Sequence, residues 1–139
     1  MASDVAHLIK VASNEISRGI NTFAHQFGLT GTQVQIIFFL SNRDENTYQK
    51  DIEKEFNIRR PTATNILKTM EKDKLITRVA VKEDSRLKKI VLSTKSQALE
   101  PKISQFMDDN NQKILSTLGT LERHSFVRAL KKIPQKLKK

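Results

Sequence analysis

Residues 47–72 read TYQKDIEKEFNIRRPTATNILKTMEK, and this stretch decides the fold. Thr47 can cap a short helix that ends near Phe56. Asn57 tolerates the left-handed backbone of a tight turn, and Pro61 suits the first turn of a second helix because its fixed φ is already helical. A short helix, a tight turn and a longer helix together predict a helix-turn-helix.

The second of these helices has two chemically different faces at 100° per residue. Its apolar side carries Ala63, Ile66, Leu67 and Met70. The opposite side offers amide, hydroxyl and cationic donors and meets no acidic residue before Glu71. Such donors can bridge base edges in a major groove, although an ordinary solvated face is the competing interpretation. The candidate recognition residues are Arg59, Arg60, Thr62, Thr64, Asn65 and Lys68.

A charged hairpin is predicted directly after the helix-turn-helix. Residues 76–81 and 90–93 read as paired strands, with residues 82–89 as the tip between them. A cationic tip can lie along a phosphate backbone or enter a narrow minor groove, whereas a solubilising turn is the competing interpretation. Asp84 and Arg86 are two residues apart, so their side chains can pair and fix the shape of the tip. The candidate wing residues are Lys82, Asp84, Arg86 and Lys88.

Two helices precede this region. An apolar stripe predicts the first over about residues 4–26, and Gly28 ends it. Thr30 and Gln33 form a capping box for the second. The run that follows is apolar nearly all round, so we expect this helix to be buried at the centre of the fold.

Two more helices follow the hairpin. Ser93 or Thr94 can cap one that reaches about residue 117, and Pro101 would kink it or delay its start. After Gly119, Thr120 can cap a last helix that Pro134 ends. 

These elements predict a mainly α chain with a small antiparallel β-hairpin, of the α+β class. A winged helix-turn-helix lobe at residues 30–93 would lie within a single domain over residues 1–139. Helices at 4–26 and 94–133 carry continuous apolar stripes that this lobe cannot cover. Pairing with a second copy would cover them, so we expect a homodimer. The expected interface residues are Val5, Leu8, Ile114, Leu118, Phe126 and Leu130.

The charge pattern favours a polyanionic partner. The formal net charge is +10, and it is concentrated in two blocks. Residues 59–89 carry ten basic and four acidic side chains, and residues 128–139 carry six basic and no acidic ones. A solvated face and a frayed tail would also produce charge runs. The alternative function is a basic winged-helix module for RNA or an anionic protein. Against RNA, most Phe residues fall at core positions and Tyr48 is the single Tyr.

Several classes of protein are disfavoured. The chain has no Cys, which excludes disulfides and thiolate metal sites. His7, His25 and His124 are scattered, and no Ser, Cys or paired carboxylates stand at catalytic spacing. A Gly-rich phosphate loop is also missing. We therefore expect no enzyme, no cofactor and no metal. An apolar run of about 18 residues and a signal peptide are also missing, so we expect a cytoplasmic protein without a membrane partner.

The sequence resembles the MarR family of bacterial transcriptional regulators over about residues 30–100, and in helix order over nearly the whole chain. The matching stretches are LTGTQ at 29–33, RRPTATNIL at 59–67, DSR at 84–86 and IVLS at 90–93. One departure is Lys74, which stands where the family usually has Gly. Another is the lack of the Gly expected soon after Ser93 and Thr94.

The resemblance implies a sequence-specific double-stranded DNA-binding regulator, expected to be a repressor, that acts as a homodimer on an inverted-repeat operator. In that family the first and the last two helices build the dimer interface. The recognition helix enters the major groove, and the residue matching Arg86 reaches the minor groove. Many relatives bind small anions between the DNA-binding lobe and the dimer helices, so a small-molecule effector is a further expectation.

Overall fold

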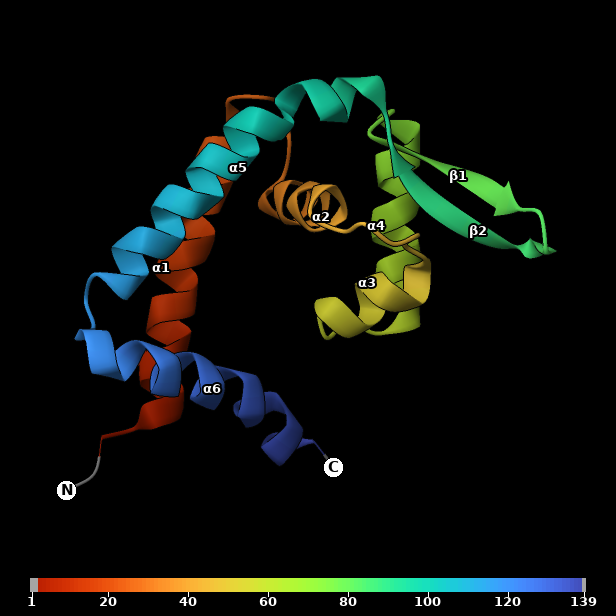
Figure 1. Cartoon of the computed structure of the whole chain (residues 1–139). Helices are drawn as coiled ribbons and strands as arrows, with labels where there is room; N and C mark the ends of the chain where they lie inside the picture. The colour runs from red at the N-terminus through yellow and green to blue at the C-terminus, as the bar shows by residue number, and fades with distance from the viewer. Residues whose placement is uncertain (1–2, 139) are drawn as a thin grey trace. The chain divides into compact units, whose positions relative to one another are not determined.

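The computed structural model describes residues 3–138 of the chain (Figure 1). Within them lie six helices and one antiparallel two-stranded sheet, which confirms the predicted fold class. The elements are α1 (Val5–His25), α2 (Gly31–Ser41), α3 (Gln49–Glu55), α4 (Arg60–Lys72), β1 (Ile76–Val81), β2 (Asp84–Leu92), α5 (Thr94–Leu115) and α6 (Thr120–Leu137). The chain divides after Ile103 into two compact units. The first contains α1 to β2 and the start of α5, and the second contains the rest of α5 and α6.

Helix α1 begins and ends as the sequence predicts. Its N-cap is Asp4, whose Oδ1 accepts a hydrogen bond of 3.1 Å from the backbone N of His7. After its last residue the chain turns through Gly28, whose φ is +70°. The backbone N of Leu29 donates to the carbonyl oxygen of Ala24 at 3.0 Å. This bond closes the last turn in the way that a glycine-terminated helix requires.

Helix α2 is the centre of the first unit. The predicted capping box is confirmed, because Thr30 Oγ1 accepts from the backbone N of Gln33 at 3.1 Å and Gln33 Oε1 accepts from the backbone N of Thr30 at 3.0 Å. Val34, Ile36 and Ile37 have no exposed surface. Complete burial of one such side chain stabilises the folded state by about 1.5–3 kcal/mol. The buried side chains of α2 therefore contribute a large part of the hydrophobic stabilisation of this unit.

A close approach joins α1 to the start of α2. The backbone N of Gly31 donates to Asn21 Oδ1 at 3.0 Å. A Cβ built on Gly31 would lie 2.2 Å from that same oxygen. Only a residue without a side chain fits this position without a shift of Asn21.

The predicted cap of α3 was wrong. The N-cap position is Tyr48, whose backbone N donates to Asp51 Oδ2 at 2.8 Å. Thr47 is instead buried, and its carbonyl oxygen accepts from the backbone N of Ile90 at 2.7 Å. The segment before α3 therefore pairs with β2, a partner far away in the sequence that no local capping pattern could reveal.

The hairpin tip is also shorter than predicted. Only Lys82 and Glu83 separate the strands, because β2 begins at Asp84. The register is irregular there: Val81 pairs with Asp84, and residues 85–87 bulge out of the ladder. This part of β2 is largely exposed. It therefore lacks the alternation of apolar and polar residues by which a sequence pattern identifies a strand.

Helix α5 begins at the predicted cap. Ser93 Oγ accepts from the backbone N of Ser96 at 3.2 Å, and Ser96 Oγ donates to the carbonyl oxygen of Leu75 at 2.7 Å. Pro101 lies inside the helix and does not delay its start at Thr94.

Two predictions for α6 were wrong. Its N-cap is Gly119 rather than Thr120, and the backbone N of Gly119 donates to Glu122 Oε1 at 2.7 Å. The helix also continues through Pro134 to Leu137. Proline removes one N–H from the helix, but at this exposed end water can satisfy the carbonyl oxygen that loses its donor.

The core of the first unit draws on most of its elements. Fully buried side chains come from α1, α2, α3, α4 and α5, represented by Ile20, Ile36, Ile52, Leu67 and Ile103. None of the helices within residues 3–138 combines the length and the apolar character that crossing a membrane needs.

Candidate nucleic-acid interface

The turn between α3 and α4 has the geometry that a helix-turn-helix needs. Asn57 has a φ of +51°, the left-handed conformation that its sequence position predicts. The Phe56 ring packs edge-on against the Phe39 ring of α2, with 5.8 Å between centroids. This contact anchors the turn to the buried central helix. The predicted Pro61 lies in the first turn of α4.

Helix α4 turns its apolar side inward and its donors outward, as predicted. Ala63, Leu67 and Met70 have no exposed surface. The exposed members of the predicted recognition set are Arg59, Arg60, Thr62, Asn65 and Lys68. No acidic residue precedes Glu71 on this helix. The exposed face therefore offers hydrogen-bond donors and positive charge without a competing carboxylate.

Thr64 differs from the rest of the recognition set. It is half-buried, and its Oγ1 accepts a hydrogen bond of 2.9 Å from Gln49 Nε2. A hydroxyl has one hydrogen to donate as well as two lone pairs. Thr64 can thus be held by α3 and still donate to a further partner.

Gln49, the first residue of α3, is a functional candidate that the sequence did not reveal. Its Nε2 donates to Thr64 Oγ1, lies 3.2 Å from Glu53 Oε2 and lies 3.4 Å from the carbonyl oxygen of Arg60. On its other side, Gln49 Oε1 lies 3.5 Å from Arg78 Nη1. One amide therefore links α3 to the start of α4 and to β1.

Arg78 extends this link. Its Nε lies 3.0 Å from Glu71 Oε1, so the first acidic residue of α4 forms an ion pair with β1. The Arg78 side chain is only 21% exposed. The pair holds the end of α4 against the hairpin and keeps the Glu71 carboxylate engaged within the fold. Only the i,i+4 spacing of Gln49 and Glu53 was a local sequence signal for this network.

The predicted pairing of Asp84 and Arg86 is confirmed, at the start of β2 next to the hairpin tip. Asp84 Oδ1 accepts from the backbone N of Arg86 at 2.9 Å and from its Nε at 3.2 Å. The Arg86 side chain is nevertheless 90% exposed. Asp84 thus positions Arg86 within the bulge while its guanidinium remains accessible. Lys82 and Lys88 are exposed as well.

A groove of about 830 Å³ brings part of the predicted site together. Arg60 and Thr64 of α4 line it together with Arg86 and Lys88 of the wing. Gln49 and Arg78 line it too, which places the positioning network at its wall. The remaining predicted DNA contacts lie outside this lining; they are Arg59, Thr62, Asn65, Lys68, Lys82 and Asp84.

The side chains predicted for a dimer interface are incompletely covered in the single chain. In α1, Val5 is 62% and Leu8 is 54% exposed, and in α6, Phe126 is 37% and Leu130 is 43% exposed. Ile114 and Leu118 are half-buried. Each unit therefore presents apolar side chains that its own residues do not cover.

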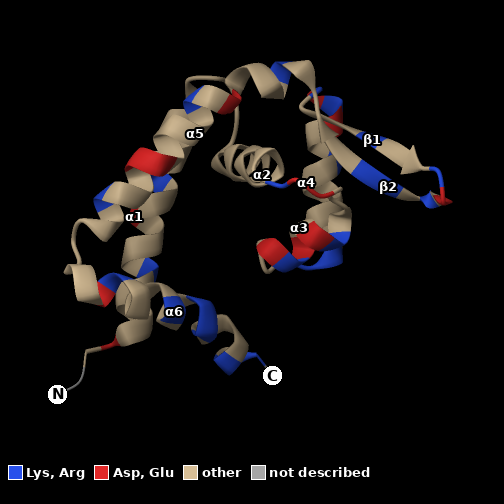
Figure 2. Cartoon of the chain, in the orientation of Figure 1, with Lys and Arg blue, Asp and Glu red and all other residues tan. Residues whose placement is uncertain are grey.

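Lys and Arg residues gather on three parts of the chain: the start of α4, the hairpin and α6 (Figure 2). No cluster of three or more potential metal-ligating side chains occurs among residues 3–138.

An exposed donor face on the second helix of a helix-turn-helix, followed by a cationic hairpin, defines a winged helix-turn-helix protein. The MarR family model matches residues 27–87. The transcription regulator MarR from Oenococcus oeni PSU-1 is 38% identical, with a TM-score of 0.88 over 95% of this chain and 99% of that chain. The chain belongs to the MarR family, as the sequence motifs predict.

Two structures from S. aureus are similar across nearly the whole chain at 26% identity. The MepR–DNA complex has a TM-score of 0.88 and covers 99% of this chain and 100% of that chain. MepR in its DNA-binding conformation has a TM-score of 0.89, and the match covers 98% of this chain and 100% of that chain. No curated protein sequence matches the chain.

Proposed function

We propose that this protein is a sequence-specific double-stranded DNA-binding transcription regulator. The observation that carries the proposal is the exposed, acid-free face of α4, held as the second helix of a helix-turn-helix beside a cationic wing. Its MarR-family relative MepR has been solved with DNA. The role is binding rather than catalysis, and its setting is the cytoplasm, where a bacterial regulator meets its DNA.

The exposed side chains divide into two roles. Asn65 lies at the middle of the α4 face and can bridge N6 and N7 of an adenine, so we assign it to base reading. Arg59, Arg60 and Lys68 can contact guanine or phosphate. Arg86 and the wing lysines are assigned to phosphate and minor-groove contacts, which add affinity with little dependence on sequence.

The functional unit in this proposal is a homodimer that represses transcription by occupying an inverted-repeat operator. A second copy would cover the apolar side chains of α1, α5 and α6, which are exposed or half-buried in the single chain. Two recognition helices related by a two-fold axis would meet major grooves about 10 bp apart. Ile114→Glu or Phe126→Glu would place an unpaired carboxylate in that interface. Either change should reduce both the mass measured by light scattering and the operator affinity.

A small-molecule effector belongs to the same proposal. A cleft of about 490 Å³ lies among α2, the segment before α3, β2 and the start of α5. Arg43 and Lys89 line it together with Glu45 and Glu100. Arg43 Nη2 lies 3.6 Å from Glu45 Oε2 and 3.8 Å from Asp51 Oδ2, so an anionic ligand would replace these carboxylates at the guanidinium. A panel of aromatic carboxylates should include one that raises the melting temperature and lowers operator affinity, and Arg43→Ala should remove both effects.

The experiment for this function is selection from a randomised duplex pool by the full-length protein. We expect enrichment of an inverted repeat, and we expect Asn65→Ala to change the preferred base at one position in each half-site. That change should cost about 1–3 kcal/mol on the original sequence. A pool that shows no enrichment would refute sequence-specific binding, and an unchanged preference for Asn65→Ala would refute its reading role.

A further inference from the structure

The second half of α6 has a charge distribution that DNA reading by α4 does not explain. Five cations lie within the last three turns of the chain's final helix and just after it: Arg128, Lys131, Lys132, Lys136 and Lys138. All five are exposed. The last acidic residue of the whole sequence is Glu122, in the first turn of α6. This set, named here the α6 strip, is therefore free of acidic neighbours along its helix.

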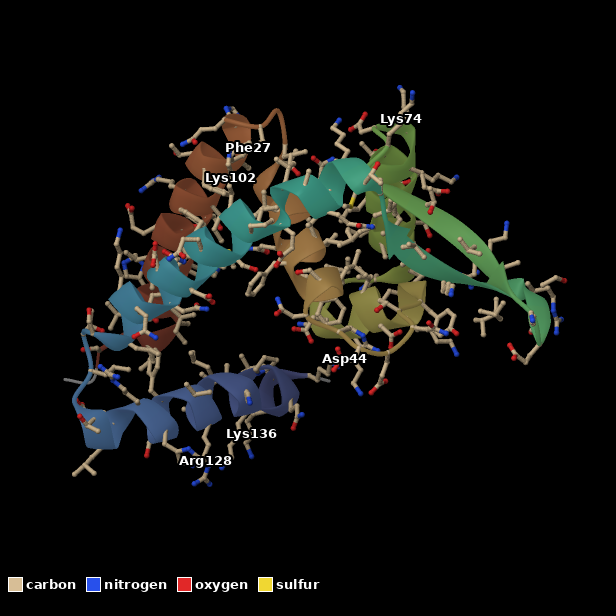
Figure 3. All side chains as sticks on the ribbon, turned by 45° about the horizontal axis from the view of Figure 1, so that its top comes forward. Phe27, Asp44, Lys74, Lys102, Arg128 and Lys136 are labelled. Carbon is tan, nitrogen blue, oxygen red and sulfur yellow. The ribbon has the colours of Figure 1, made fainter. Side chains whose placement is uncertain are left out.

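The helix geometry places these cations on one side. At 100° per residue the α6 strip spans an arc of about 160° that is centred near Arg128. Figure 3 shows the labelled side chains of Arg128 and Lys136 leaving the same side of α6. The opposite arc contains the apolar residues Phe126, Val127, Leu130 and Ile133. The helix is thus divided into a basic side and an apolar side.

None of the five cations forms an ion pair with an acidic side chain within residues 3–138. A charge kept for solubility is usually mixed with acids or spread over a surface. The first 58 residues of this chain follow that pattern, with five basic and seven acidic side chains. The α6 strip departs from it, and its uncompensated charge is available to an external polyanion.

We propose that the α6 strip is a second nucleic-acid-binding surface, which binds the phosphate backbone of duplex DNA without reading bases. At a rise of 1.5 Å per residue the strip is about 15 Å long. Duplex DNA carries one charge per ~1.7 Å of its axis when both strands are counted, so a length of duplex equal to the strip carries roughly nine phosphate charges, or roughly four to five on each strand. This density is high enough for every lysine and arginine of the strip to meet a phosphate.

The apolar side of α6 decides between DNA and a membrane as the partner. A basic amphipathic helix binds a bilayer by inserting its apolar side. That insertion requires Phe126, Val127 and Leu130, which are 37–43% exposed in the single chain. In the homodimer of the proposed function, on which this step rests, a second copy covers these residues. Only the basic side then remains accessible.

The test uses the full-length protein with Lys131→Gln, Lys132→Gln and Lys136→Gln combined. A matched control combines Lys10→Gln, Lys95→Gln and Lys113→Gln, which removes the same charge from exposed positions outside the α6 strip. A second control replaces the three strip lysines with Arg. Affinity for a 40-bp random duplex is measured against salt concentration by fluorescence anisotropy, and light scattering checks that each variant has the wild-type mass.

Each phosphate contact contributes about 0.9 to the slope of log K against log salt. The strip variant should therefore have a slope lower by up to about 2.7, whereas the matched control and the Arg variant should keep the wild-type slope. An unchanged slope in the strip variant overturns the proposal, as does an equal loss in the matched control. If the strip variant loses binding to phosphatidylserine vesicles while its duplex binding is unchanged, the proposal is overturned and the partner of the α6 strip is a membrane.

A different quantity, the ratio of two affinities, tests the proposed function independently of the α6 strip. The ratio of affinities for the selected inverted repeat and the random duplex depends on α4, and the strip variant should keep this ratio. A preserved ratio with an unchanged salt slope refutes only the α6 strip. A wild-type ratio near one refutes the proposed function instead.

Discussion

Gln49→Ala tests whether the α3–α4 link positions the recognition helix. The change removes the hydrogen bonds of Nε2 to Thr64 Oγ1 at 2.9 Å and to Glu53 Oε2 at 3.2 Å. An NH₂ group has two donors, so the longer 3.4 Å approach to the Arg60 carbonyl is not counted as a third bond. Net contributions of about 0.5–1.5 kcal/mol for each partly exposed bond predict a loss of about 2 kcal/mol.

That loss should be visible in unfolding and in DNA binding. For a chain of this size, 1 kcal/mol corresponds to roughly 4 °C in melting temperature, so Gln49→Ala should melt about 8 °C lower. Operator affinity should fall more than random-duplex affinity, because Thr64 and the start of α4 lose their orientation. Urea unfolding at fixed protein concentration provides the free energy, and anisotropy provides both affinities.

Two variants make the result interpretable. Lys50→Ala changes an exposed neighbour on the same helix and should leave the free energy of unfolding within about 0.5 kcal/mol of wild type. Gln49→Met keeps the side-chain length without its hydrogen bonds and should resemble Gln49→Ala. If Gln49→Ala has the same free energy of unfolding as Lys50→Ala, the Gln49 hydrogen bonds do not stabilise the fold and this prediction is refuted.

Three further changes follow from the local geometry. Arg86→Ala should lower affinity for selected and random duplexes alike and reduce the salt slope by about 0.9, measured by anisotropy; a changed base preference would contradict the wing assignment. Gly31→Ala should cost about 1–3 kcal/mol in urea unfolding, because its Cβ would lie 2.2 Å from Asn21 Oδ1. Adding Asn21→Ala should recover part of this loss, and no recovery would exclude the clash as its cause. Lys74→Gly should raise stability by up to about 1 kcal/mol, because Lys74 has a φ of +61°. Lys74→Ala keeps the Cβ and should bring no such gain.

The parts of the fold that depend on local patterns could be predicted from the sequence. The Thr30–Gln33 capping box, the left-handed Asn57 and the inner side of α4 each follow from residues close together in the chain. The Asp84–Arg86 pair was predictable for the same reason. The φ of Lys74 explains why a glycine would suit that position, which the family resemblance had marked.

The features that were missed depend on distant partners or on solvent. Thr47 pairs with β2 instead of capping α3, and Gln49 meets residues of α4 and β1. The extra length of β2 lies in exposed residues without an apolar rhythm. Pro134 does not end α6, because at an exposed helix end water can replace the lost hydrogen bond. The predicted DNA contacts and dimer residues remain predictions, since they concern partners outside this chain.

The central claim is that the exposed face of α4 reads the sequence of duplex DNA. The most direct measurement is a competition titration of the wild-type protein bound to its selected, labelled inverted repeat at fixed salt. Unlabelled copies of that repeat should displace the label at least ~10³-fold more effectively than a scrambled duplex of equal length and composition. Single-stranded RNA should compete no better than the scrambled duplex. Equal competition by the repeat and the scrambled duplex, or stronger competition by the RNA, would contradict the claim.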